Sequence, residues 1–246
     1  MGIGPQFVSP PFAPRRRFFV SVDLGQSNDR SACGVLDRSI VDGGPDPVSF
    51  GRLEVVHFDL RHLQRFDLGT PYPRIVSALG DLLDSLALRF PDVDVELVFD
   101  RTGVGRAVGD LLWALPQFRS PRVSGSGRVR LVPVSVHGGD NVTTKVDGLG
   151  VPKRDLISAA VVLFQAGLLR MAASIPERDA LVLELVNFRS RISAGGTDTY
   201  GNDPKRAKND DLVTVVSVAA WGAQRDRRKR GYLPRTGPLP GMPILG

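Results

Sequence analysis

Aspartates stand at three places in this chain where regular structure would bring them to one cleft. Asp23 follows the apolar run 18–22, and Asp100 follows the apolar run 93–99. Both runs have the β-branched and aromatic content of buried strands, so each acid is predicted at the carboxyl end of a strand. Asp210 and Asp211 precede apolar residues at helical spacing and are predicted in the first turn of a late helix. Because ligands in open α/β sheets bind outside the carboxyl ends of the strands, we expect these acids to face one cleft.

Such a cleft is suited to phosphodiester chemistry. Mg²⁺ and Mn²⁺ prefer oxygen ligands, and two ions about 4 Å apart activate a water, offset transition-state charge and stabilise the leaving oxygen. In this hypothesis Asp23 bridges two ions, Asp100 binds one, and Asp211, assisted by Asp210, binds the other. For each acid alone, the competing interpretation is a turn or helix cap.

Zinc chemistry and disulfide bonding are disfavoured by the sequence. His57, His62 and His137 show no paired ligand spacing, and Cys33 is the one cysteine of the chain, so it has no intramolecular partner. We expect Cys33 to pack in the core.

Length and composition favour one enzyme-sized domain. The chain has 246 residues, 42% of them hydrophobic, which is enough for one large core. A net charge of +6 suits a polyanionic partner such as nucleic acid. No apolar stretch reaches the roughly 20 residues of a membrane helix and no signal-peptide pattern opens the chain, so we expect no membrane association and a cytoplasmic location.

The order of the expected elements predicts the fold class. A Pro- and Gly-rich tail over residues 1–17 precedes three antiparallel strands, and a basic, Pro- and Gly-rich tail over residues 224–246 follows the last helix. The elements between them are helices over 72–90, 105–115, 151–171, 176–190 and 209–223, strands over 93–99 and 126–137, and a loop or hairpin over 193–208. This order predicts an α/β domain over residues 18–223, an RNase H-like mixed sheet with helices on both faces.

Five segments carry a family resemblance. VSVDLGQSNDRSACGVL, ELVFDRTGVGRAVGDLL, VPKRDLISAAVVLFQAGLLRM, ALVLELVNFRS and NDDLVTVVSVAAW resemble, in order and spacing, the nuclease domain of the large terminase subunit of tailed bacteriophages. The resemblance implies Mg²⁺- or Mn²⁺-dependent cleavage of double-stranded DNA with little sequence specificity. It implies metal binding by Asp23, Asp100 and Asp211, with Asp210 as the neighbouring acid. It also implies that Lys153 and Glu184 lie beside the site.

The sequence departs from that family in informative ways. Asn209 stands where a histidine is usual, and Thr214 stands where a further acid is frequent. No GxxxxGK[ST] phosphate loop occurs in the chain, so the predicted activity is cutting without an ATPase motor. Either a packaging ATPase is separately encoded, with a small terminase subunit and a portal as further partners in the host cytoplasm, or this chain is the nuclease part of a longer terminase.

Basic residues near the late helix are predicted to contact DNA. Lys205, Arg206 and Lys208 lead into the acid pair, and Lys153 begins an earlier helix. Contacts with phosphates would be independent of sequence. The basic runs 15–17 and 225–230 are further candidates for holding the phosphate backbone, and the competing interpretation is a solvated tail that contacts nothing.

Three other functions remain open at this stage. A Holliday-junction resolvase or transposase would keep the metal site and change the DNA substrate. An actin-like ATPase or sugar kinase is suggested by VDLGQS and DRTGVG, which resemble phosphate-binding turns, but 246 residues leave little room for the second domain of that class. A non-catalytic DNA-binding module would bind DNA without cleaving it.

Overall fold

The computed structural model describes residues 15–25, 29–48, 51–119, 126–192, 198–202 and 210–228. In these residues the main sheet has eight strands in the order β6-β7-β5-β4-β1-β2-β3-β8. Their bounds are β1 (Arg15–Asp23), β2 (Ala32–Pro45), β3 (Arg52–Arg65), β4 (Asp94–Asp100), β5 (Val129–His137), β6 (Thr143–Lys145), β7 (Gly148–Pro152) and β8 (Leu169–Met171). Strands β1, β2 and β3 form an antiparallel meander, while β4 and β5 continue the sheet parallel to β1.

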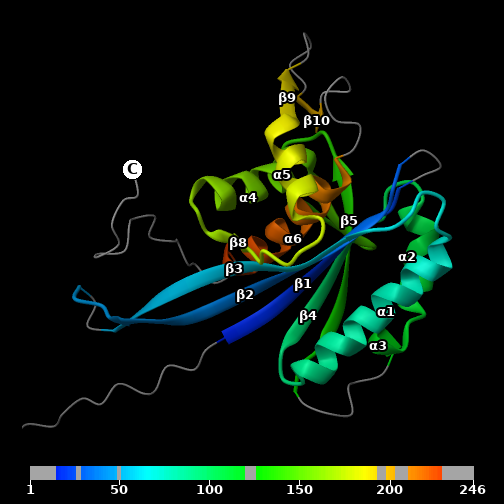
Figure 1. Ribbon diagram of the computed structural model, residues 1–246. Helices are drawn as coiled ribbons and strands as arrows, with labels where there is room; N and C mark the ends of the chain where they lie inside the picture. The colour runs from blue at the N-terminus through cyan, green and yellow to red at the C-terminus, as the bar shows by residue number, and fades with distance from the viewer. Residues whose placement is uncertain are drawn as a thin grey trace, which may run out of the picture.

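Helices cover both faces of the sheet. Helices α1, α2 and α3 lie on one side, and α4, α5 and α6 lie on the other (Figure 1). Their bounds are α1 (Tyr72–Arg89), α2 (Gly105–Trp113), α3 (Pro116–Arg119), α4 (Lys153–Gln165), α5 (Arg178–Asn187) and α6 (Asp211–Arg228). This mixed sheet, with a 3-2-1-4-5 strand order at its centre, confirms the predicted RNase H-like fold class.

Alternation along β1 shows why the two layers form. Phe18, Val20 and Val22 pack in the core shared with α1, whereas Phe19 packs in the core shared with α6. Ser21 also faces α6, and its hydroxyl donates a hydrogen bond to the carbonyl of Val215 at 2.8 Å. A strand buried on both faces accounts for the continuous apolar run in the sequence.

Helix α6 is anchored to the sheet at its far end. The Arg38 guanidinium donates to the carbonyl of Ala223 at 2.9 Å, and Arg225 pairs with the buried Glu96 at 2.6 Å. Gly222 lies against Phe19, where an added Cβ would be 3.2 Å from the ring. These contacts hold α6 across the sheet, and the helix continues to Arg228, beyond the predicted end at 223.

The first arginines belong to the sheet. Strand β1 begins at Arg15, three residues before the predicted domain start at 18. Arg15 pairs with Glu54, Arg16 with Asp37, and Arg17 with Asp94 and Glu96. Residue 15 is eight residues from Asp23, or roughly 26 Å along an extended strand. Residues 15–17 therefore lie at the opposite end of β1 from Asp23, and their contact with DNA phosphates stays a prediction.

The predicted helix over 151–171 is divided in the structure. Residues 151 and 152 end β7, and α4 is followed by Gly167, whose φ of +62° is a left-handed conformation. The amide of Leu168 donates to the carbonyl of Leu163 at 2.9 Å, which closes the helix end. The chain then enters β8, which pairs with β3. The apolar pattern continues past the helix end, so periodicity alone did not reveal the break.

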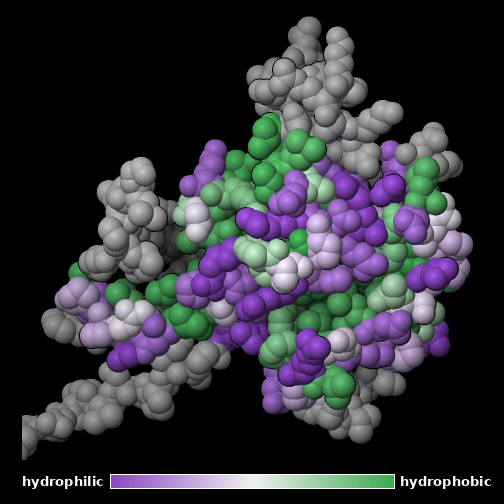
Figure 2. Space-filling view, viewed as in Figure 1, coloured by the Kyte–Doolittle hydropathy of each residue, from purple (hydrophilic) through white to green (hydrophobic). Residues whose placement is uncertain are grey.

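The segment after α5 forms a hairpin in its described part. Strand β9 (Phe188–Ile192) pairs with β10 (Asp198–Asn202), so the hairpin begins inside the predicted helix over 176–190, and only β10 lies within the predicted loop or hairpin over 193–208. Helix α5 ends at Asn187 and leaves Val182, Leu183 and Val186 exposed. Hydrophobic side chains gather on the surface just below the grey atoms in the upper part of the view, over α5 (Figure 2). Among the described residues, no helix is long and apolar enough to cross a membrane.

Candidate metal centre

Asp23 and Asp100 end two neighbouring parallel strands. In the β1–β4 register Val22 lies beside Phe99, so the next residues, Asp23 and Asp100, continue adjacent strands in step. Neighbouring strands are about 4.8 Å apart. Val22 and Phe99 pack toward α1, so alternation directs both aspartates toward the α6 side. The structure therefore brings together the two strand-end acids that the sequence predicted.

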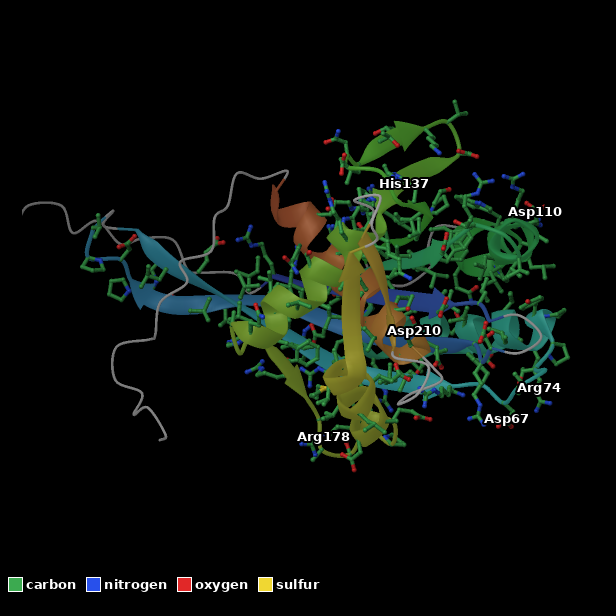
Figure 3. All side chains as sticks on the ribbon, turned by 90° about the horizontal axis from the view of Figure 1, so that it is seen from above. Asp67, Arg74, Asp110, His137, Arg178 and Asp210 are labelled. Atoms are coloured by element: carbon green, nitrogen blue, oxygen red, sulfur yellow. The ribbon has the colours of Figure 1, made fainter. Side chains whose placement is uncertain are left out.

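The start of α6 brings further carboxylates to the same place. A pocket is lined by Asp23, Leu24, Gly25, Asp29, Arg30, Asp210 and Asp211. Asp210 immediately precedes the helix, and its carbonyl accepts the amide of Thr214 at 2.9 Å. Seen from above, Asp210 lies nearer the middle of the molecule than Asp67 or Arg74 (Figure 3).

Burial and neighbouring negative charges oppose the ionisation of the carboxylates in this cleft. Burial raises the pKa of Asp23 to about 7, and the negative charges of Asp211, Asp210, Asp100 and Asp29, in that order, add to the effect. Burial also raises the pKa of Asp210, while the ammonium of Lys153 acts in the opposite direction. A cluster of acids whose ionisation is opposed by burial and by its neighbours is typical of functional sites.

Asp100 is held by its own turn. Its Oδ1 accepts hydrogen bonds from the amide of Thr102 at 2.9 Å and from the Thr102 hydroxyl at 2.5 Å. Gly103 has a φ of +59°, and a Cβ at Gly105 would lie 1.9 Å from the Asp100 carbonyl oxygen. Two glycines are thus required for the chain to turn from β4 into α2 beside this carboxylate.

Asp211 and Glu184 are joined by a residue that the sequence did not single out. Arg65, the last residue of β3, donates from Nε to Asp211 Oδ2 at 2.7 Å and from Nη2 to Asp211 Oδ1 at 3.3 Å. Its Nη2 also pairs with Glu184 Oε1. Glu184 Oε2 accepts the amides of Leu212 and Val213, each at 3.1 Å. The predicted site-adjacent Glu184 therefore lies at the site, where it caps the first turn of α6.

The two neighbouring acids, Asp210 and Asp211, therefore have different surroundings. Asp211 is buried, and both of its carboxylate oxygens accept hydrogen bonds from Arg65. Asp210 is partly buried in the cleft, with Lys153 as a nearby cation. The predicted proximity of Lys153 to the acids is thus seen in the structure, whereas Lys205, Arg206 and Lys208 lie outside the described residues.

Asp29 is a fifth acid that sequence reasoning missed. The chain after β1 returns on itself, so that a Cβ at Gly25 would lie 2.2 Å from the carbonyl oxygen of Asp29. The amide of Gly25 donates to Ser31 Oγ at 3.0 Å. The signal in the sequence was an aspartate six residues after Asp23 in a turn-forming segment, but nothing local showed that Asp29 lies beside the strand end.

The donor set fits a hard divalent cation. Asp23, Asp100, Asp210 and Asp29 offer carboxylate oxygens, which Mg²⁺ and Mn²⁺ prefer, and a cation among them would offset the burial and the like charges that raise the pKa of Asp23. Within the described ranges, no three histidine, cysteine or acidic residues are already close enough to enclose an ion.

These features define an RNase H-like protein with an acidic cleft. No family model and no curated protein matches the chain. Among solved structures, the chain is similar to the human cytomegalovirus terminase nuclease domain soaked with Mn, with a TM-score of 0.49 and 13% identity over 87% of this chain and 86% of that one. The inhibitor-bound, Mn-soaked form of that domain gives a TM-score of 0.47 and 11% identity over 85% and 82%. RuvC of Thermus thermophilus gives 0.33 and 14% identity over 86% and 96%. With TM-scores below 0.5, these similarities do not assign the fold class by themselves. The fold class follows from the strand order and the placement of the helices.

Proposed function

We propose that this chain is a divalent-cation-dependent endonuclease that cleaves double-stranded DNA. The observation that carries the proposal is the convergence of Asp23, Asp210 and Asp29 in one pocket, with Asp100 on the adjacent strand end. Asp23 would be shared between two Mg²⁺ or Mn²⁺ ions, and Asp100 and Asp210 would each bind one of them. Asp211, the acid first expected in that role, is assigned to the ion pair with Arg65.

The residues of the chain have distinct tasks in this mechanism. Bound divalent ions supply an activated water and offset the charge that develops on the phosphate. Asp23 must be ionised to bind a cation, and its pKa of about 7 means that a cation competes with a proton for this carboxylate near neutral pH. Lys153, at the start of α4 and near Asp210, is placed to contact a phosphate oxygen of the DNA backbone. A phosphate contact carries no base information, which supports low sequence specificity.

The resemblance of five sequence segments to phage terminase nuclease domains supports DNA as the substrate. It also supports a role in genome packaging, in which a packaging ATPase, a small terminase subunit and a portal would be the partners. A Holliday-junction resolvase would share the acidic cleft and differ in substrate, so linear duplex, supercoiled plasmid and four-way junctions should be compared directly.

The test is cleavage of supercoiled plasmid by the purified chain in Mn²⁺, in Mg²⁺ and in excess chelator. We expect nicking and linearisation in either metal and none in chelator. Asp23→Asn and Asp100→Asn should each lower the rate by about 10³-fold, since each removes several kcal/mol of transition-state stabilisation. Asp110→Asn is the matched control, because Asp110 is an exposed aspartate on α2, away from Asp210 (Figure 3).

Full activity in both Asp23→Asn and Asp100→Asn would show that the cleft is not the catalytic site. Tight DNA binding without cleavage in either metal would instead indicate a non-catalytic DNA-binding module.

A further inference from the structure

We propose that Arg65 and Glu184 are positioning residues that fix the first turn of α6 and thereby set the direction of Asp210 in the cleft. The proposal rests on the metal-binding role assigned to Asp210 above. It gives the Arg65 guanidinium a function in metal affinity although it is not a ligand.

Arg65 joins three elements at one point. Its guanidinium reaches Asp211 on α6 at 2.7 Å and Glu184 on α5, and its Nη1 lies 3.6 Å from Glu177, just before α5. The Arg65 side chain is 14% exposed, and those of Asp211 and Glu184 are 7% and 5% exposed. Charge-assisted hydrogen bonds in such a shielded place are strong and directional.

Glu184 contacts the helix itself, and we call the pair formed by Arg65 and Glu184 the clamp. The first amides of a helix have no partner within it, and a carboxylate there also interacts favourably with the helix dipole. Glu184 supplies this carboxylate from α5, accepting the amides of Leu212 and Val213 at 3.1 Å each. Through Arg65 and Glu184, the first turn of α6 is therefore fastened to both β3 and α5.

Holding Asp211 in place also restricts the backbone of its neighbour, Asp210. Asp210 is joined to Asp211 by one peptide bond, and the Thr214 amide holds the Asp210 carbonyl at 2.9 Å. The orientation of the Asp210 backbone is thus set from both sides, which leaves its side chain to face the pocket shared with Asp23. Groups behind the ligands that hold them in place typically govern metal affinity as well as geometry.

The replacement Arg65→Lys separates charge from geometry. A lysine keeps the positive charge but presents one ammonium instead of a planar fork, so it cannot span Asp211 and Glu184 together. If charge alone mattered, Arg65→Lys would behave as the wild type, whereas the clamp requires Arg65→Lys to resemble Arg65→Gln.

The experiment measures Mn²⁺ affinity by electron paramagnetic resonance of the free ion, together with the Mn²⁺ dependence of plasmid cleavage. For Arg65→Gln, Arg65→Lys and Glu184→Gln we expect Mn²⁺ binding weakened by roughly 10- to 100-fold, as is usual when a group behind a ligand is lost. The cleavage rate should recover toward the wild-type value at saturating Mn²⁺. Arg225→Gln is the control, because it removes another ion pair of α6, with Glu96, at the far end of the helix.

A general loss of folding would lower the amplitude of cleavage at every Mn²⁺ concentration and leave the half-saturating concentration unchanged. Wild-type Mn²⁺ affinity in Arg65→Gln, or an equal loss in Arg225→Gln, would overturn the positioning role.

A metal-free measurement distinguishes this proposal from the proposed nuclease activity. Hydrogen exchange of the Leu212 and Val213 amides should accelerate in Arg65→Gln and stay at the wild-type rate in Arg225→Gln. If the wild type binds Mn²⁺ and does not cut DNA, the nuclease proposal fails while the affinity comparison still decides the clamp. Unchanged exchange in Arg65→Gln overturns the clamp even if the wild type is an active nuclease.

Discussion

At the scale of single residues, the four site aspartates predicted from the sequence carry the same carboxyl group and differ in their surroundings. Asp23 is surrounded by like charges, Asp100 is held by Thr102, Asp211 is paired with Arg65, and Asp210 lies in the cleft near Lys153. Identical carboxyl groups thereby acquire different roles, since solvation and neighbouring charge decide how readily each one ionises and binds a cation.

The raised pKa of Asp23 predicts how metal-free stability depends on pH. The folded-state pKa is about 7 and the ordinary value is 3.8, so between these values the folded chain holds the proton more tightly than the unfolded chain. Stability from this group is therefore present at low pH and is lost as the pH rises toward 7. In chelator at pH 8, Asp23→Asn should raise the free energy of unfolding by roughly 2–4 kcal/mol, and by less at pH 5.

Urea unfolding of the wild type and Asp23→Asn at the two pH values measures this difference. If the free energies of unfolding of the two proteins differ by the same amount at pH 5 and pH 8, the pKa of Asp23 is not raised in the folded chain. Mn²⁺ added at pH 8 should stabilise the wild type and have little effect on Asp23→Asn.

The neighbouring acids Asp210 and Asp211 should respond oppositely to the same substitution. Asp210→Asn should remove metal-dependent cleavage with little loss of stability, because it removes a carboxylate whose ionised form is disfavoured by burial. Asp211→Asn removes one of the charged partners of the shielded Arg65, which keeps Glu184 and Glu177, and should lower the free energy of unfolding by about 2 kcal/mol through the loss of charge-assisted hydrogen bonds. Thermal unfolding and Mn²⁺-dependent nicking of both variants check the pair, and the reverse pattern would return the ligand role to Asp211.

At the scale of elements, the site depends on where β1 and β4 end and where α6 begins. The turn from Asp100 into α2 requires a close approach at Gly105, and the start of α6 is held from β3 and α5. These are connections between elements, so the precision of the cleft is set by tight turns and buried ion pairs instead of by the elements' own regular geometry.

Gly105→Ala tests the turn. Its Cβ would lie 1.9 Å from the Asp100 carbonyl oxygen, so the backbone must shift and carry Asp100 with it. We expect a loss of roughly 1–3 kcal/mol in stability and a larger fractional loss of cleavage than the fraction unfolded explains. Gly138→Ala is the control, since nothing lies within 4 Å of an added Cβ there. Cleavage that falls only in proportion to the folded fraction would show that the turn does not position Asp100.

At the scale of the whole molecule, the basic residues behind the net charge of +6 differ in whether acids inside the fold compensate their charge. Arginines at the far end of the sheet are paired with acids: Arg16 with Asp37, Arg17 with Asp94, and Arg225 with Glu96. Their charge is therefore largely compensated within the fold. A cation beside the acidic cleft, such as Lys153, is better placed to contribute to DNA binding.

Lys153→Gln should weaken duplex binding and reduce the slope of log affinity against log salt by about one, as expected for the loss of one phosphate contact. The measurement is fluorescence anisotropy of a labelled duplex across a salt series, in Ca²⁺ or chelator so that no cleavage occurs. Arg89→Gln, an exposed residue at the far end of α1, should leave the slope unchanged. Equal slopes in Lys153→Gln and the wild type would remove Lys153 from the DNA interface.

The sequence by itself determined the fold class and the main acids, because these depend on local pattern. Apolar runs ending in Asp23 and Asp100 specify two strand ends, and helical spacing after Asp211 specifies a helix start. The order of such elements leaves few topologies available, and the RNase H-like one was confirmed.

Only the tertiary structure decided which acid pairs with Arg65 and which acids face the cleft. Arg65 and Asp211 are 146 residues apart in the chain, and Glu184 meets the amides of α6 from a different helix. Nothing in a local pattern specifies such partners, since they are fixed only when β3, α5 and α6 pack together. The physical reason is that periodicity records which face of an element is buried, whereas the ionisation and role of a carboxylate depend on the charges and dipoles that folding places beside it.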